Sequence, residues 1–325
     1  MQKRVLLKVL ALGSLLACGA ASAEEPAYPS RPVTLVVGFA PGGGVDLMAR
    51  YIARKLGDRL GQPVIVENKA GAGGTIGAAH VAKARPDGHT LLFTSVAHSI
   101  NQSFYPSLPF DSLKDFAPVS PVATAPNGIA ARIDAPYNTL HEMIAYAKAN
   151  PEKVTYGAVS GSTTMYLGMA MFERAAGLKL RYIPYGGTMA SVQATLAGET
   201  DLVSSGYASS DAFVQSGKLK MLAVTTTKPT HLAPNVPTVA AAANLPGFEV
   251  VNWMGILAPA QTPASVVKRL NEEIRKIQDD PESEPFFLAQ KNDKFHDTPE
   301  AFGKLIAVDI ARYGKIIKDT GAALK

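Results

Sequence analysis

Short runs of β-branched residues alternate with amphipathic helical patterns through most of this chain, and that alternation limits the folds it can adopt. Val33 to Val37 has the composition of a buried strand, and from about Asp46 apolar residues recur at helical spacing. Gly61 suits the end of that helix, and Pro63 prevents it from resuming. The strand–helix order recurs several times, which predicts an α/β fold built on parallel strands.

Threonines mark three expected helix starts in the later part of the chain. Thr139 and Glu142 have the spacing of a capping box, in which a hydroxyl and a carboxylate satisfy the first backbone amides of a helix. Thr262 and Thr298 each precede a proline, a residue that suits the first helical position. Each of the two is therefore expected to cap a helix.

The strands and helices fall into two α/β series followed by a helical C-terminus. A proline-rich stretch around residues 234–246 separates the second series from that terminus. We therefore predict two lobes: residues 24–125 plus 249–325 form the first, and residues 126–248 form the second. The C-terminal segment then returns to complete the first lobe.

The first residues have the layout of a secretory signal peptide. Three basic residues precede the apolar run from Val9 to Ala17, which is too short for a permanent membrane anchor. Ala21-Ser22-Ala23 supplies the small residues of a cleavage site. This layout predicts that residues 1–23 are a signal peptide and that the protein works in the periplasm.

The only cysteine, Cys18, lies within this segment. It follows Leu15-Leu16-Ala17, which resembles a lipobox, so a lipid anchor at Cys18 is the alternative to cleavage after Ala23. Cleavage after Ala23 leaves a chain without a thiol, which excludes disulfides and thiol catalysis. The remaining length of about 300 residues suits two domains.

Several other function classes lack their sequence signals. The formal net charge is +5, but no basic stripe with interleaved aromatic residues points to nucleic acid. No later segment approaches the ~18 uninterrupted apolar residues of a membrane span. The six histidines are scattered, and neither a nucleophile elbow nor a zinc-protease motif occurs. We therefore expect that the protein is not an enzyme and that it binds neither a metal nor a cofactor. The alternative from another functional class is an exported hydrolase with Ser160 or Ser162 as its nucleophile.

Two loops have the character of anion sites. Gly38 to Asp46 contains Gly42-Gly43-Gly44 between a strand and a helix, where free backbone amides and the helix dipole attract an anion. Ser160 to Thr164 repeats that position in the second series, with hydroxyls in place of most glycines. A plain turn and a helix cap are the structural alternatives. Gly71 to Gly77 has the spacing G-x-G-x-x-x-G, which does not fit a dinucleotide site, and we expect a helix start bordering the pocket.

A series of motifs resembles a known family. In chain order they are Tyr28-Pro29-Ser30-Arg31-Pro32-Val33, the loop Phe39–Asp46, Val66-Glu67-Asn68-Lys69-Ala70-Gly71-Ala72-Gly73-Gly74, Pro86-Asp87-Gly88-His89-Thr90-Leu91-Leu92, Asp115-Phe116-Ala117-Pro118-Val119 and Ile183-Pro184-Tyr185. Together they resemble the Bug family of extracytoplasmic receptors for tripartite tricarboxylate transporters. The resemblance implies a Venus-flytrap fold with two crossover segments, a small carboxylate ligand and the membrane subunits of a transporter as partners.

The resemblance also implies the ligand-binding residues. The first-lobe positions are Phe39, Ala40, Pro41, Gly42, Gly43, Gly44, Ser95 and His98, and the second-lobe positions are Ser160, Ser162, Thr163, Thr164 and Tyr185. We expect a monomer that hands its ligand to the transporter. A periplasmic adaptor for a signalling receptor is the alternative.

Departures from the family pattern bear on the ligand. Ser205 stands where many relatives have an acid, which argues against an amino-acid ligand, and Tyr207 follows that segment. Tyr166 replaces a common histidine, and Tyr185-Gly186-Gly187 replaces a common Tyr-Lys-Gly. Together with Phe39 and Tyr185 these side chains offer aromatic faces. They favour an aromatic carboxylate such as terephthalate over citrate or adipate, unless the tyrosines are packing residues.

Overall fold

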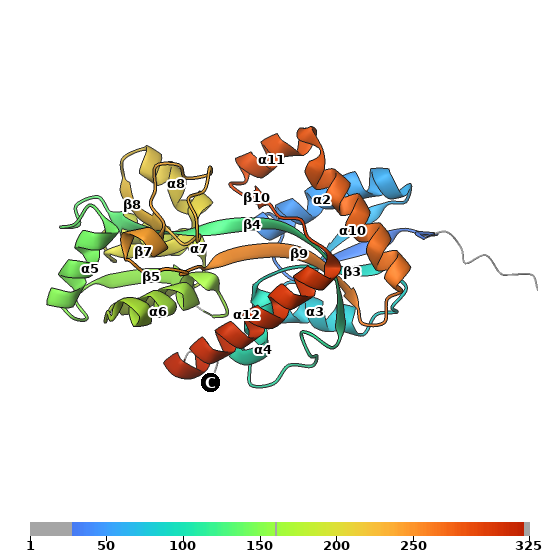
Figure 1. The fold of residues 1–325 in the computed structure, drawn as a ribbon, viewed down its shortest axis with the longest axis horizontal. Helices are drawn as coiled ribbons and strands as arrows, with labels where there is room; N and C mark the ends of the chain where they lie inside the picture. Colours follow the sequence, from blue (N-terminus) through green and yellow to red (C-terminus); the bar gives the residue numbers. More distant parts are fainter. Residues whose placement is uncertain (1–27, 160, 322–325) are drawn as a thin grey trace, which may run out of the picture.

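A computed structural model describes residues 28–159 and 161–321, which form two lobes on the two halves of one ten-stranded mixed sheet (Figure 1). The predicted two-lobed α/β architecture is confirmed. The predicted signal peptide and the alternative lipid site at Cys18 lie outside the described residues.

The first lobe contains a sheet in the order β2-β1-β3-β9-β4, in which β1, β2 and β3 are parallel and β9 is antiparallel to β3. Its strands are β1 (Val33–Val37), β2 (Val64–Asn68), β3 (Thr90–Ser95), β9 (Val251–Pro259) and the short β10 (Asp293–Lys294). Its helices are α2 (Gly44–Leu60), α3 (Thr75–Ala82), α4 (Ala97–Phe104), α10 (Ala264–Asp279), α11 (Glu284–Ala289) and α12 (Pro299–Thr320).

The second lobe repeats the parallel plan. Its strands β5, β6 and β7 are parallel, while β8 runs antiparallel to the shared strand β4 (Phe116–Arg132). Its elements are α5 (Leu140–Ala149), β5 (Thr155–Val159), α6 (Thr164–Ala176), β6 (Arg181–Tyr185), α7 (Thr188–Leu196), β7 (Leu202–Gly206), α8 (Tyr207–Gln215), β8 (Leu219–Val224) and α9 (Val239–Ala242).

Strand β4 passes from one lobe into the other (Figure 1). It pairs with β9 as far as Pro126, with β7 from Asn127 onward and with β8 from Gly128 onward. The second connection lies beside it, because the Thr225 amide donates to the carbonyl of Asn127 and the Val250 amide donates to the carbonyl of Thr225. Two adjacent segments therefore join the lobes. The lobe boundaries at residues 125 and 248 stay predictions.

Two of the three predicted threonine helix caps form in the structure. Thr139 Oγ1 accepts from the Glu142 amide, and Thr298 Oγ1 accepts from the Ala301 amide, so both predicted caps are confirmed. The cap at Thr262 is wrong. Its hydroxyl donates to the carbonyl of Pro259 at 2.7 Å, and α10 begins after Pro263 without a side-chain cap.

Helix α12 runs from the first lobe to α6 of the second (Figure 1). Leu167 of α6 is completely buried in the same apolar cluster as Trp253 and Tyr313. At the surface, Arg174 of α6 forms an ion pair with Asp319 of α12 at 2.8 Å. The C-terminal helix therefore completes the first lobe and also contacts the second.

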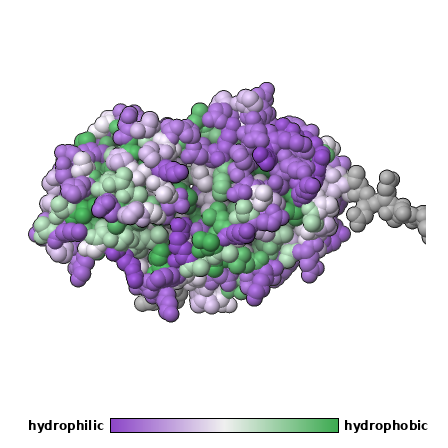
Figure 2. Space-filling model, in the orientation of Figure 1, coloured by the Kyte–Doolittle hydropathy of each residue, from purple (hydrophilic) through white to green (hydrophobic). Residues whose placement is uncertain are grey.

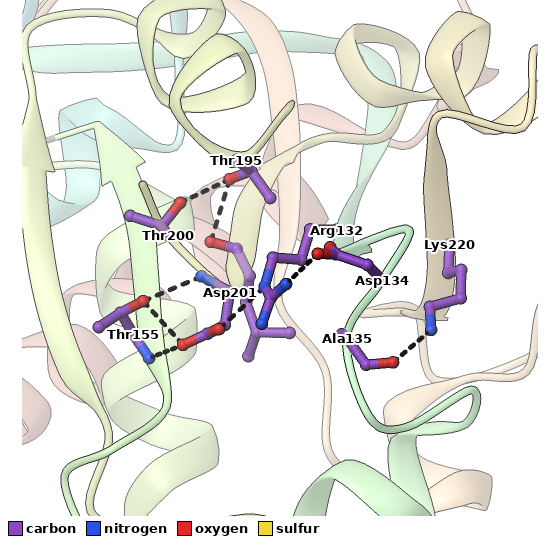
Figure 3. Close-up of polar contacts among 9 residues, drawn as sticks. Arg132, Asp134, Ala135, Thr155, Thr195, Thr200, Asp201 and Lys220 are labelled. Carbon is purple, nitrogen blue, oxygen red and sulfur yellow. Dashed lines mark hydrogen bonds and ion pairs between the residues drawn. The ribbon is translucent and has the colours of Figure 1, made fainter. Parts of the chain in front are cut away.

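A polar network ties together the strands of the second lobe (Figure 3). Asp201 Oδ2 accepts from both the amide and the hydroxyl of Thr155 at 2.9 Å, and Asp201 Oδ1 accepts from Arg132 Nε at 3.1 Å. Arg132 also pairs with the exposed Asp134. The network fixes three neighbouring strands, because Thr155 begins β5, Asp201 immediately precedes β7 and Arg132 ends β4.

Hydrophilic residues cover most of the first lobe at the upper right of Figure 2, while hydrophobic ones show near the middle of that face.

None of the helices within residues 28–159 and 161–321 combines the length and apolar character needed to cross a bilayer.

Candidate functional site

A cavity of about 360 Å³ lies between the lobes, where the parallel strands end. The first lobe lines it with Phe39, Val45, Gly73, Ser95, Val96, Ala97, Tyr105 and Asn252, and the second with Val159, Gly161, Ser162, Thr163, Thr164 and Met165. Residues of both predicted anion-binding loops, 38–46 and 160–164, therefore line the cavity.

Three helices begin at this cavity. Val45 lies in the first turn of α2, Ala97 is the first residue of α4, and Thr164 and Met165 open α6. The first amides of a helix have no intrahelical acceptor, and the helix dipole makes this end positive. No Asp, Glu, Lys, Arg or His is among the described lining residues. The cavity can thus attract an anion through neutral donors alone.

The first-lobe loop is held in shape by buried Asp46. Its Oδ2 accepts from the Gly42 amide at 2.8 Å and from Arg50 Nε at 2.9 Å, while Asn68 bridges Asp46 Oδ1 and the carbonyl of Phe39. Burial disfavours the charged form of Asp46, but the hydrogen bonds from Arg50, Gly42 and Asn68 outweigh it and lower the pKa of the carboxyl group. Asp46 in its charged form therefore organises the loop.

The hydrogen bonds of Asp46 change the expected role of residues 39–44 in ligand binding. The Gly42 amide is already occupied by Asp46, so it is not free for a ligand. Of the predicted first-lobe loop residues only Phe39 lines the cavity, while Ala40, Pro41, Gly42, Gly43 and Gly44 are exposed beside it. Val45, one residue further along, lines the cavity instead.

The second-lobe loop contributes three of its predicted residues. Ser162, Thr163 and Thr164 all line the cavity, whereas Ser160 lies outside the described residues. Thr163 also caps α6: its hydroxyl donates to the carbonyl of Val159 at 2.9 Å and accepts from the Tyr166 amide. Thr163 therefore has a structural role, which leaves the buried Ser162 and Thr164 as the hydroxyls to consider for a ligand.

The structure places Ser95 at the cavity but His98 in the core. The His98 side chain is buried, its Nε2 lies 2.9 Å from the carbonyl of Ser112, and its ring stacks parallel to Phe110. Burial lowers the pKa of His98 to about 4, although the hydrogen bond to Ser112 opposes the shift. His98 is therefore a neutral core residue, and α4 presents its first residues, not this ring, to the cavity.

The remaining predicted residues also lie away from the cavity. Ser205 is buried and its hydroxyl is 2.6 Å from that of Ser210. The Tyr207 hydroxyl donates to Asp211, and the Tyr166 ring stacks on Tyr182.

Tyr185 packs against Gly157 of the neighbouring strand, where a β-carbon would come within 2.9 Å of its ring. Three of the four rings expected to surround an aromatic ligand are thus packing residues in this structure.

Tyr105 and Asn252 also line the cavity, although no local sequence pattern marks either residue. Gly73 fits the expectation that the glycine-rich segment borders the pocket. Its Cα faces the other lobe so closely that a β-carbon there would lie 2.6 Å from Ser162 Oγ. The absence of a side chain at Gly73 therefore permits close approach of the lobes.

Comparisons with known proteins place the chain among transporter receptors. A family model described as the tripartite tricarboxylate transporter family receptor matches residues 48–322. A protein from the tcbD-tcbE intergenic region of Pseudomonas sp. (strain P51) is 40% identical over 77% of this chain and 74% of its own length. Protein BugT of Bordetella pertussis is 33% identical over 98% of both chains.

Solved structures are similar as well. The periplasmic binding protein BugD is 32% identical, with a TM-score of 0.76 over 92% of this chain and all of that one. A Rhodopseudomonas palustris protein with adipate is 29% identical, with a TM-score of 0.78 over 90% of this chain and 98% of that one. MatC from the same organism, with bound malate, is 29% identical. Its TM-score is 0.75 over 89% of this chain and all of that one.

Proposed function

Because this chain belongs to the tripartite tricarboxylate transporter receptor family, we propose that it captures a small dicarboxylate in the periplasm and delivers it to the membrane subunits of such a transporter. The family is one of solute receptors, which sets aside the exported hydrolase. The observation that carries the proposal is the convergence of α2, α4 and α6 on one interlobe cavity without a charged lining side chain.

Two separated donor sets favour a ligand with two anionic ends. One carboxylate lies at the starts of α2 and α4 on the first lobe, and the other lies at the start of α6, near Ser162 and Thr164. Such a ligand bridges the lobes, so its binding energy favours the closed state. The adipate-bound and malate-bound relatives support this ligand class.

The structure gives less support to an aromatic ligand than the sequence did. Phe39 lines the cavity together with Tyr105, but Tyr166, Tyr185 and Tyr207 do not. The proposal therefore covers aliphatic and aromatic dicarboxylates alike, bound by a monomeric receptor.

A thermal-shift screen tests the proposal. Adipate, malate and terephthalate are compared with the monocarboxylate benzoate, a neutral sugar and a cationic amine. A ligand at 100 times its dissociation constant stabilises the native state by about 2.7 kcal/mol. We expect dicarboxylates to raise the melting temperature most. Stabilisation by the sugar or the amine alone would refute the proposal.

A further inference from the structure

A second cavity, of about 590 Å³, lies at the opposite edge of the first-lobe sheet. Ser30 and Arg31 precede β1 and His89 precedes β3, whereas the cleft residues Phe39 and Ala97 follow those same strands. Strands of this length span about 17 Å, so the two cavities are separate. Two motifs that the cleft does not use, residues 28–33 and 86–92, meet here.

Arginines dominate the second cavity. Arg31, Arg85 and Arg269 all line it, and Asp87 is the one carboxylate among the described lining residues. Asp87 is held by Arg31 at 2.9 Å and lies 3.6 Å from Arg85. Arg269 pairs with Glu273, which lies on the same helix and does not line the cavity. Positive charge is therefore in excess.

The start of α10 adds backbone donors. Pro263, Ser265 and Val266 line the cavity, and α10 is a 16-residue helix whose first turn has no side-chain cap. Pro263 has no amide hydrogen and the Val266 amide donates to the Pro263 carbonyl, so among these three residues the Ser265 amide is the donor for a ligand. The Thr262 hydroxyl, which precedes this turn, is bound to the carbonyl of Pro259. The dipole and the first amides of α10 thus act in the same direction as the three guanidinium groups.

His89 supplies an independent sign of a ligand. The residue lines the cavity and is 7% exposed, and its Nδ1 lies 3.1 Å from the carbonyl of Asp87. That contact requires a proton on Nδ1, which leaves Nε2 as an acceptor when the ring is neutral. Nε2 is buried and has no hydrogen-bond partner within the described part of the chain. His89 therefore leaves an unsatisfied acceptor in the wall of the cavity, which a ligand bearing an O–H, such as monohydrogen phosphate, would reach only after a small shift of the ring.

We propose that this cavity binds a phosphoryl oxyanion, either free phosphate or the phosphate of an anionic lipid headgroup. Arginine guanidinium groups donate two parallel hydrogen bonds to phosphate oxygens, and the amides at a helix N-terminus donate to a third oxygen. Arg31 makes the shortest contact with Asp87, at 2.9 Å, whereas Arg85 lies 3.6 Å from Asp87 and Arg269 lies 3.4 Å from Glu273 outside the cavity. Arg85 and Arg269 are therefore the principal ligand-binding cations. The site acts independently of the carboxylate cleft.

Calorimetry with inorganic phosphate tests the site, using Arg85→Gln/Arg269→Gln as the variant. Arg275→Gln is the matched control, because Arg275 lies on the same helix, pairs only with Asp279 among the described residues and does not line the cavity. We expect one phosphate per wild-type chain, at least about tenfold weaker binding in the double variant and unchanged binding in the control. No binding by the wild type, or equal binding by all three proteins, would overturn the proposal.

Vesicle sedimentation distinguishes the two sources of phosphate. Vesicles containing phosphatidylglycerol are compared with pure phosphatidylcholine vesicles. Retention on the anionic vesicles that the double variant loses and the control keeps identifies a headgroup site. Phosphate binding without such retention identifies a site for the free anion. Dicarboxylate binding at the cleft is measured in parallel and is expected to be the same in all three proteins.

Discussion

Ser162 Oγ of the second lobe lies 2.6 Å from the point that a β-carbon on Gly73 of the first lobe would occupy. A side chain at position 73 would therefore keep the lobes apart. Because the proposed ligand bridges the lobes, anything that prevents this approach weakens binding.

Gly73→Ala tests the interlobe contact. Gly73 has φ +64°, so alanine also costs about 1 kcal/mol of backbone strain. Gly177→Ala is a matched control, since Gly177 has the same φ and nothing lies within 4 Å of its added β-carbon. We expect both variants to lose similar stability, but only Gly73→Ala to lose dicarboxylate affinity in calorimetry, by about tenfold or more. Equal affinity in the two variants would contradict a closure role for Gly73.

His98 predicts a specific pH dependence of stability. Burial lowers its pKa in the folded protein to about 4, below its ordinary value of 6.5. The unfolded chain therefore binds a proton first as the pH falls, so stability is lost between about pH 6.5 and 4 and then levels off for this group. His98→Phe, which keeps a ring beside Phe110, is expected to flatten that part of the profile. Urea unfolding at several pH values measures it; an unchanged slope would show that other groups titrate there.

The network around Asp201 predicts a large effect of a side chain far from the cleft (Figure 3). Asp201→Ala leaves the amide and hydroxyl of Thr155 and one edge of Arg132 without their acceptor. We expect a loss of about 1–3 kcal/mol in the free energy of unfolding. Asp134→Ala removes the exposed partner of the same arginine and is expected to change little. Similar losses in both variants would show that the charge of Arg132, not the strand amide, matters.

The general plan of the fold follows from the sequence, but β4 does not. This 17-residue strand contains Pro118, Pro121 and Pro126, which argue against a strand because proline donates no ladder hydrogen bond. The structure accommodates two of them with register shifts against β9, between Pro118 and Ser120 and between Pro121 and Ala123. Only the tertiary pairing reveals such bulges.

The candidate site was predictable where it depends on local structure. The loop at Ser162 to Thr164 is found from a strand followed by hydroxyl residues and a helix. Side-chain direction was not predictable: His98 and Tyr207 occupy positions near the site in sequence, but packing turns both away. Tyr105 and Asn252 reach the cavity only through folding of distant segments.

In the proposed function, neutral helix N-termini, not charged side chains, hold the carboxylates. Proline at the first helical position removes one amide and suits the helix when an extended residue precedes it. Gly43 and Thr163 are both extended, so Gly44→Pro and Thr164→Pro are compatible with α2 and α6. Thr188→Pro is the control, because Gly187 is also extended and α7 does not line the cavity.

Calorimetric titration of these three variants with the dicarboxylate that stabilises the wild type most tests the claim directly. We predict that Gly44→Pro and Thr164→Pro each lose about tenfold or more in affinity, while Thr188→Pro binds as the wild type does. Wild-type affinity in both Gly44→Pro and Thr164→Pro would contradict the account.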